Sequence, residues 1–137
     1  MMRISRQLAV VAATIAALAY FTGANAEDKK TLEIKDCMQC QNSARGALGK
    51  LAKAKEVDWD SAAEKSKAWL AAAGDIGKNR PPIGDEKSWK EQTEKYLTNV
   101  KAVDDAVGKK DVSAMTKALG TFGASCQGCH SKHRQKK

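Results

Sequence analysis

The sequence predicts an all-α fold, an antiparallel four-helix bundle. In four separate stretches, apolar residues recur at intervals of three and four, the spacing that gives an α-helix one buried face. No stretch shows the strict alternation of apolar and polar residues that is typical of a half-buried strand. Short segments rich in glycine, proline and aspartate separate the four stretches. The chain has 137 residues, which is enough for one domain of this kind.

Residues Met1–Ala26 have the form of a signal peptide and are excluded from the predicted fold. Two arginines precede the uncharged, mostly apolar run Leu8–Phe21, and Ala24-Asn25-Ala26 is a cleavage site of the small-x-small type. An uncleaved anchor is the alternative, but the run is shorter than the roughly 20 residues of a transmembrane helix. We therefore expect an exported, periplasmic protein whose single domain is residues 27–137, without stable membrane insertion.

The first two helices precede a proline-containing loop. The first is expected over roughly Thr31–Lys55, with an inward stripe at Ile34, Cys37, Met38, Ala44, Leu48, Leu51 and Ala52. The second is expected to start at Ser61, because Ser61-Ala62-Ala63-Glu64 has the form of a capping box, and to stop at Gly74. Its inward residues are expected to be Ala62, Ser66, Trp69, Leu70 and Ala73.

The last two helices follow the loop Gly74–Asp85, in which Pro81-Pro82 cannot continue a helix. Asp85 is the expected N-cap of the third helix, which runs to about Val107 with inward residues Trp89, Thr93, Tyr96, Val100, Val103 and Val107. Asp111 is the expected N-cap of the fourth, whose stripe is Val112, Met115, Leu119, Phe122, Cys126 and Cys129. Two cysteines therefore extend an apolar stripe that faces the bundle interior.

These cysteines belong to the motif Cys126-Gln127-Gly128-Cys129-His130. Two cysteines three residues apart, with a histidine directly after them, are the pattern of c-type haem attachment. Each thiol adds to one vinyl group of the porphyrin, and the histidine ligates the iron. A disulfide, half of a zinc site and a thioredoxin-like pair are the alternatives, but zinc needs further ligands and a thioredoxin-like pair needs a βαβ context. We predict one covalent haem c, held by Cys126 and Cys129 with His130 as proximal ligand.

The motif lies at the end of a small helical chain and is followed by Arg134, four residues after the histidine. In these features the chain resembles the cytochrome c′ and cytochrome c-556 family of class II c-type cytochromes. The resemblance covers the chain after the signal peptide. It implies a four-helix bundle with the haem motif on the last helix, and Arg134 beside the iron's histidine in the haem site. It also implies that two copies can form a homodimer.

The same resemblance implies that a residue of the first helix lies over the open face of the haem, near Cys37-Met38-Gln39. Methionine there resembles the low-spin members, in which the thioether binds iron. We therefore predict Met38 as the distal iron ligand. The alternative is that Met38 is a packing residue, as methionines in cores commonly are. The family often carries an arginine one turn earlier, where this chain has Ile34 and Lys35.

A second cysteine pair, Cys37 and Cys40, has the thiol spacing of a haem motif but is followed by Gln41 rather than histidine. A second covalent haem is therefore not expected. A copper or zinc site would need further ligands, and His133 is the remaining histidine. In an oxidising compartment, an intramolecular Cys37–Cys40 disulfide is the leading interpretation.

The charge indicates the kind of partner. The formal net charge is +8, and it becomes +6 without the signal peptide, which carries two basic residues and no acidic one. This favours redox partners with acidic patches; nucleic acid is not expected, because aromatic residues for base stacking are few. The predicted function is one-electron transfer, with no enzymatic activity and no catalytic residue. The alternatives are a five-coordinate cytochrome c′-type protein that binds nitric oxide or carbon monoxide, and a thiol-based redox protein using Cys37 and Cys40.

Overall fold

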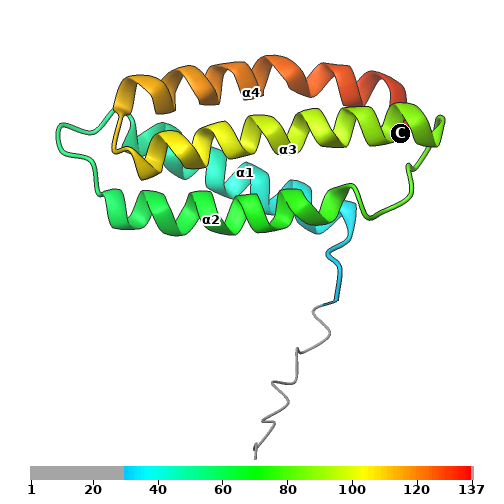
Figure 1. Ribbon diagram of the computed structural model, residues 1–137, viewed down its shortest axis with the longest axis horizontal. Coiled ribbons are helices and arrows are strands. Elements are labelled where there is room, and N and C mark those ends of the chain that lie inside the picture. Colours follow the sequence, from blue (N-terminus) through cyan, green and yellow to red (C-terminus); the bar gives the residue numbers. More distant parts are fainter. Residues whose placement is uncertain (1–29, 137) are drawn as a thin grey trace, which may run out of the picture.

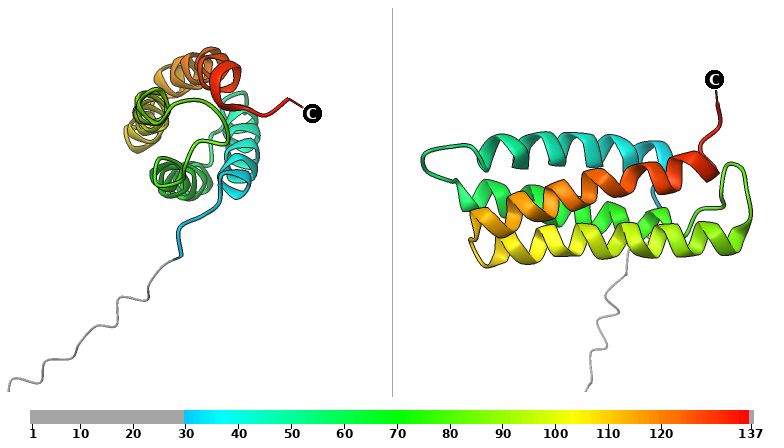
Figure 2. Two further views of the ribbon diagram at one scale, coloured as in Figure 1. Left: turned by 90° about the vertical axis from the view of Figure 1, so that its right-hand side faces the viewer. Right: turned by 90° about the horizontal axis from the view of Figure 1, so that it is seen from above.

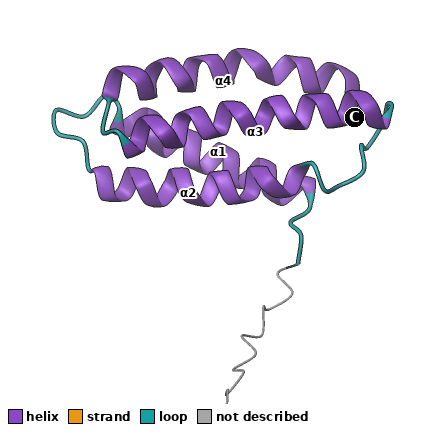
Figure 3. Ribbon diagram, viewed as in Figure 1, coloured by secondary structure: helices purple, strands orange, loops and turns teal. Residues whose placement is uncertain are grey.

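The computed structural model describes residues 30–136, and the predicted signal peptide lies outside this range. The helices are α1 (Ile34–Leu51), α2 (Trp59–Ile76), α3 (Glu86–Gly108) and α4 (Val112–His133). Helices and loops account for the whole described range, without a strand (Figure 3). No helix within residues 30–136 is long and apolar enough to cross a membrane. The predicted all-α class is therefore confirmed.

The four helices form an antiparallel bundle (Figure 1). Successive helices pack side by side, α1 on α2, α2 on α3 and α3 on α4, whereas α1 and α4 scarcely contact each other. Seen end-on, the helices surround a common centre (Figure 2). The start of α1, the end of α2, the start of α3 and the end of α4 therefore share one end of the bundle. The haem motif lies on α4, the C-terminal helix, as predicted.

Aspartates begin three of the helices. Asp85 and Asp111 accept hydrogen bonds from backbone N–H groups of their first turns, at 2.8 Å each, so both predicted N-caps are confirmed. The predicted start of the second helix is wrong. Its N-cap is Asp58, which accepts from the Ser61 N–H at 3.0 Å, so Ser61 lies inside the first turn. Both residues are good caps by local chemistry, but the helix starts earlier because the half-buried Trp59 packs on the core.

The helix ends also differ from prediction. The helix α1 is shorter at both ends than the expected Thr31–Lys55, and α2 continues past Gly74 to Ile76, which is buried. Val112, expected to face inward, is 36% exposed, because it is the first residue of α4 and lies at the outer edge of the bundle. The remaining stripe residues of α3 and α4 are buried or half-buried.

The core is divided along the bundle. A large apolar cluster fills the end where the α1–α2 and α3–α4 turns lie, and it includes Leu48, Trp69, Val103, Met115 and Phe122. Its aromatic centre is the edge-to-face pair of Trp69 and Phe122, with ring centroids 4.6 Å apart. A second, smaller cluster of Cys37, Ile76 and Trp89 lies at the opposite end. Side chains alone fill the first end, whereas the second contains a cavity.

Candidate functional site

The cavity has a volume of about 840 Å³ and lies among α1, α3 and α4. This volume is within the range typical of cofactor and ligand sites. The walls include apolar and aromatic side chains beside thiols and histidines. The principal lining residues are Ile34 and Met38 of α1, Ile76 of α2, Trp89, Gln92 and Tyr96 of α3, and Cys126, Cys129, His130 and His133 of α4.

The wall from α4 carries the predicted attachment motif. Cys126, Cys129 and His130 all line the cavity and are half-buried. Positions i, i+3 and i+4 share one face of a helix, so regular α4 geometry brings the two thiols and the imidazole to the same wall. Burial, together with the neighbouring Cys126, raises the pKa of the Cys129 thiol.

Gly128, inside the motif, is where α3 approaches α4 closely. A Cβ at this position would lie 3.1 Å from the Gln92 Oε1 atom of α3. The absence of a side chain therefore lets the polar end of Gln92 reach the motif. Gln92 was not predicted as a site residue, because the sequence contains no signal that connects it with the cysteines.

His133 closes the end of the cavity. It is 2% exposed, and its Nδ1–H donates to the Ile83 carbonyl oxygen at 2.8 Å. Its Nε2 lies 3.0 Å from the Ser88 hydroxyl, and its ring packs edge-to-face on Trp89 at 5.3 Å. With Nδ1 protonated, Nε2 can accept from Ser88, so both ring nitrogens have partners. His133 thus ties the α2–α3 loop to the end of α4.

Arg134 follows directly after α4. Its backbone N–H donates to the His130 carbonyl oxygen at 3.2 Å, and its side chain lines the cavity although the residue is exposed. The structure therefore places Arg134 at the mouth of the cavity on the same wall as His130. It is the C-cap residue and no longer helical.

Met38 lies on the wall that α1 contributes, together with Ile34. It is half-buried and packs against the small cluster of Cys37, Ile76 and Trp89. Two roles are thus compatible with its position: donor of a thioether to the cavity, and apolar wall residue.

Cys37 and Cys40 do not line the cavity. Both are free thiols: the Cys37 Sγ contacts the Leu32 carbonyl oxygen at 3.9 Å, and the Cys40 Sγ contacts the Ala68 carbonyl oxygen of α2 at 3.7 Å. The disulfide expected between them is therefore not formed in this structure. The two thiols extend toward different neighbours, one before α1 and one on α2.

Tyr96 separates the cavity from the large core. It lines the cavity, and its hydroxyl accepts a hydrogen bond from Trp69 Nε1–H at 3.1 Å. Burial raises the pKa of its phenol, so Tyr96 stays neutral and this wall carries no charge. The sequence predicted Tyr96 and Trp89 as core residues, because the spacing of a core stripe and of a cavity wall is the same.

The donor set of the cavity fits a covalently attached haem. Two thiols and one imidazole share a helical face, as attachment and iron ligation require. The surrounding aromatic and aliphatic side chains suit an apolar porphyrin, and Arg134 at the mouth can balance negative charge there. Bundle cores hold cofactors in this way, with side chains from facing helices.

Comparisons with known proteins agree with this chemistry. A family model described as cytochrome C′ matches residues 83–134, which include the end of the α2–α3 loop, α3 and the motif. A curated cytochrome c′ from Alcaligenes xylosoxydans xylosoxydans is 34% identical over 62 residues, covering 44% of this chain and 49% of the relative. The match thus spans about half the length of that relative. No solved structure matches the chain significantly. The bundle, the motif on its last helix and these matches agree: the chain belongs to the cytochrome c′ family, and its cofactor is covalent haem c.

Proposed function

We propose that Cys126 and Cys129 tether the haem and that His130 is its proximal iron ligand. This is supported by the shared face of α4 and by the cavity that all three residues line. The haem supplies an iron centre that can exchange an electron or bind a diatomic gas. The chain supplies the ligand, an apolar enclosure, and the positive charge of Arg134 at the mouth.

The function that we propose is binding of nitric oxide or carbon monoxide at a five-coordinate iron. This is the behaviour that membership of the cytochrome c′ family favours, and it replaces Met-ligated electron transfer as the first candidate. The observation that carries it is the packing of Met38. Its side chain is part of an apolar cluster with Ile76 and Trp89, so it can serve as a wall that admits a small gas molecule.

One-electron transfer with Met38 as distal ligand remains the second candidate. The observation in its favour is that Met38 lines the cavity and carries the only thioether among the lining residues. Thioether ligation would raise the reduction potential and fill the sixth position of the iron. The two functions therefore differ in one bond, from the Met38 sulfur to the iron.

Absorption spectra of the ferric and ferrous protein, with and without carbon monoxide, test the proposal. A five-coordinate iron gives a high-spin spectrum and binds carbon monoxide without displacing a protein ligand. Met38→Leu removes the thioether at nearly constant volume, and Ile34→Val is a matched control on the same wall. If gas binding is correct, both variants keep the wild-type spectrum. A low-spin wild type that becomes high-spin only in Met38→Leu would establish the second candidate instead.

We also propose that the protein acts in the periplasm after removal of residues 1–26. The form of that segment supports this, although it lies outside the described residues. The +6 charge of the remaining chain would favour an electron donor with an acidic surface, and two copies could associate as a homodimer. Sedimentation of the purified protein, and its N-terminal sequence after export, test these two points.

A further inference from the structure

One pair of thiols has no part in the function proposed above. Cys37 and Cys40 lie one turn apart on α1, and neither lines the cavity, so a bound haem leaves them uncovered. They differ in burial: Cys37 is 0% exposed, whereas Cys40 is partly accessible. Their Sγ atoms contact only carbonyl oxygens, on opposite sides of the pair.

We propose that Cys37 and Cys40 are a dithiol site that external disulfides oxidise reversibly to an intramolecular disulfide. Side chains three apart on a helix have Cβ atoms about 5–6 Å apart, whereas a disulfide needs roughly 3.5–4.5 Å. Rotation of both thiols and a small adjustment of the backbone are therefore required. A bond closed under such strain is easily reduced, which is typical of exchangeable rather than permanent disulfides.

The difference in burial assigns the order of the two steps. The Cys40 thiolate attacks one sulfur of the external disulfide, forms a mixed disulfide and releases the first thiolate. Cys37, deprotonated, then attacks the Cys40 sulfur, closes the Cys37–Cys40 bond and releases the second thiolate. The two released thiolates take up the two protons that the protein thiols lose. The protein dithiol is oxidised by two electrons, and the external disulfide is reduced to two thiols.

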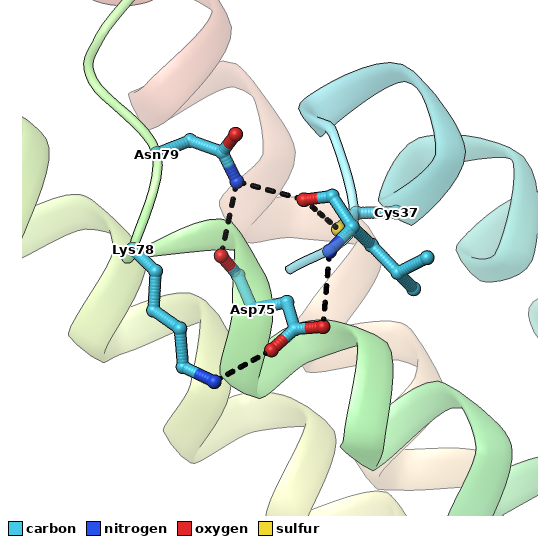
Figure 4. Close-up of polar contacts among 5 residues, drawn as sticks. Cys37, Asp75, Lys78 and Asn79 are labelled. Carbon is cyan, nitrogen blue, oxygen red and sulfur yellow. Dashed lines mark hydrogen bonds and ion pairs between the residues drawn. The ribbon is translucent and has the colours of Figure 1, made fainter. Parts of the chain in front are cut away.

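The surrounding contacts allow the thiols to move without leaving a carbonyl unsatisfied. The Leu32 oxygen keeps its second donor, Asn79 Nδ2, at 2.9 Å (Figure 4). The Leu32 N–H remains bound to Asp75 Oδ2 at 3.2 Å, so the segment before α1 stays attached to the end of α2. The Ala68 oxygen lies within α2, where the backbone N–H four residues later is its regular partner. Closing the disulfide therefore costs only the two weak S–H···O contacts.

Polar anchoring also explains why the site lies at this place. Asn79 Nδ2 bonds both the Leu32 oxygen and the Asp75 backbone oxygen, and Lys78 Nζ pairs with Asp75 Oδ1 at 2.7 Å (Figure 4). These bonds hold the first turn of α1 against α2 independently of the sulfur atoms. The pair can thus change oxidation state while the fold around it persists.

The test uses the complete haem-loaded protein in buffers of reduced and oxidised glutathione, quenched with acid and alkylated. Alkylation of the peptide that contains both cysteines should fall from two labels to none in one step as the oxidised fraction rises, and return on reduction. Failure to oxidise at any glutathione ratio would overturn the proposal. So would a stable glutathione adduct in the wild type without ring closure.

Single variants test the assigned roles. Cys37→Ser should stop at a stable glutathione adduct on Cys40. Cys40→Ser should react on the order of tenfold more slowly, because a buried thiol is poorly reactive. Equal reactivity of the two variants would refute the order of attack. Cys37→Ala repeats the first measurement if serine is poorly tolerated at the buried position. The haem spectrum of each variant reports on the proposed function separately, since neither cysteine lines the cavity.

Discussion

Substituting Gly84 by alanine should open the contact that closes the haem cavity. Gly84 has φ = 85°, in the left-handed region, where residues with a Cβ are strained. A Cβ at Gly84 would lie 2.9 Å from His133 Nδ1 and 2.9 Å from the Lys132 carbonyl oxygen. Both distances are shorter than a van der Waals contact, so either the loop or the end of α4 must shift.

The expected cost has two parts. The left-handed conformation of an alanine costs roughly 1–2 kcal/mol. Displacing His133 weakens its hydrogen bond to the Ile83 oxygen, and a lost buried hydrogen bond costs about 1–3 kcal/mol. Because the loop can relax in part, we expect Gly84→Ala to lower the free energy of unfolding by about 2–4 kcal/mol.

Urea unfolding of the haem-loaded protein, followed by circular dichroism, measures this change. Gly46→Ala is the matched control: Gly46 is an exposed residue inside α1, and its added Cβ would meet no atom within 4 Å. It should stabilise the protein by roughly 0.5–1 kcal/mol, the ordinary gain of alanine over glycine in a helix. A Gly84→Ala variant as stable as wild type would show that this loop contact does not constrain the site.

Three further predictions concern single contacts. Hydrogen bonding to a backbone N–H at the start of α3 lowers the pKa of Asp85 below its ordinary value of 3.8, so its contribution is present above that pH and lost as the pH falls through the lowered pKa. Thermal melts between about pH 2 and 6 should therefore be flatter for Asp85→Asn, which caps without titrating; parallel curves would contradict this. Tyr96→Phe leaves the buried Trp69 N–H without an acceptor and should cost about 1–3 kcal/mol in urea unfolding, and an unchanged midpoint would show that another acceptor replaces the phenol. In the wild type, intact mass after denaturation should include one haem, whereas the double variant Cys126→Ser and Cys129→Ser should release its haem into acidified organic solvent. Retention of the haem by that double variant would refute the tether.

Local sequence determined much of the bundle. Asp85 and Asp111 begin their helices because a short carboxylate satisfies free N–H groups within one turn, a contact that depends on no other part of the chain. The stripe from Trp89 to Val107 marks one face of α3 for the same reason, since helical periodicity is a local property. The attachment motif is also local, because Cys126, Cys129 and His130 need only a regular helix to share a wall.

Tertiary structure decided what those faces meet. Periodicity identifies an inward face but not whether side chains or a cavity lie opposite, so Tyr96 and Met115 have the same pattern although only Tyr96 lines the cavity. His133 is buried because the α2–α3 loop passes over it, a contact between residues 50 apart in sequence. The directions of the Cys37 and Cys40 thiols likewise depend on neighbours outside α1. Contacts between distant segments depend on how the helices assemble, and a pattern within one helix contains no information about its neighbours.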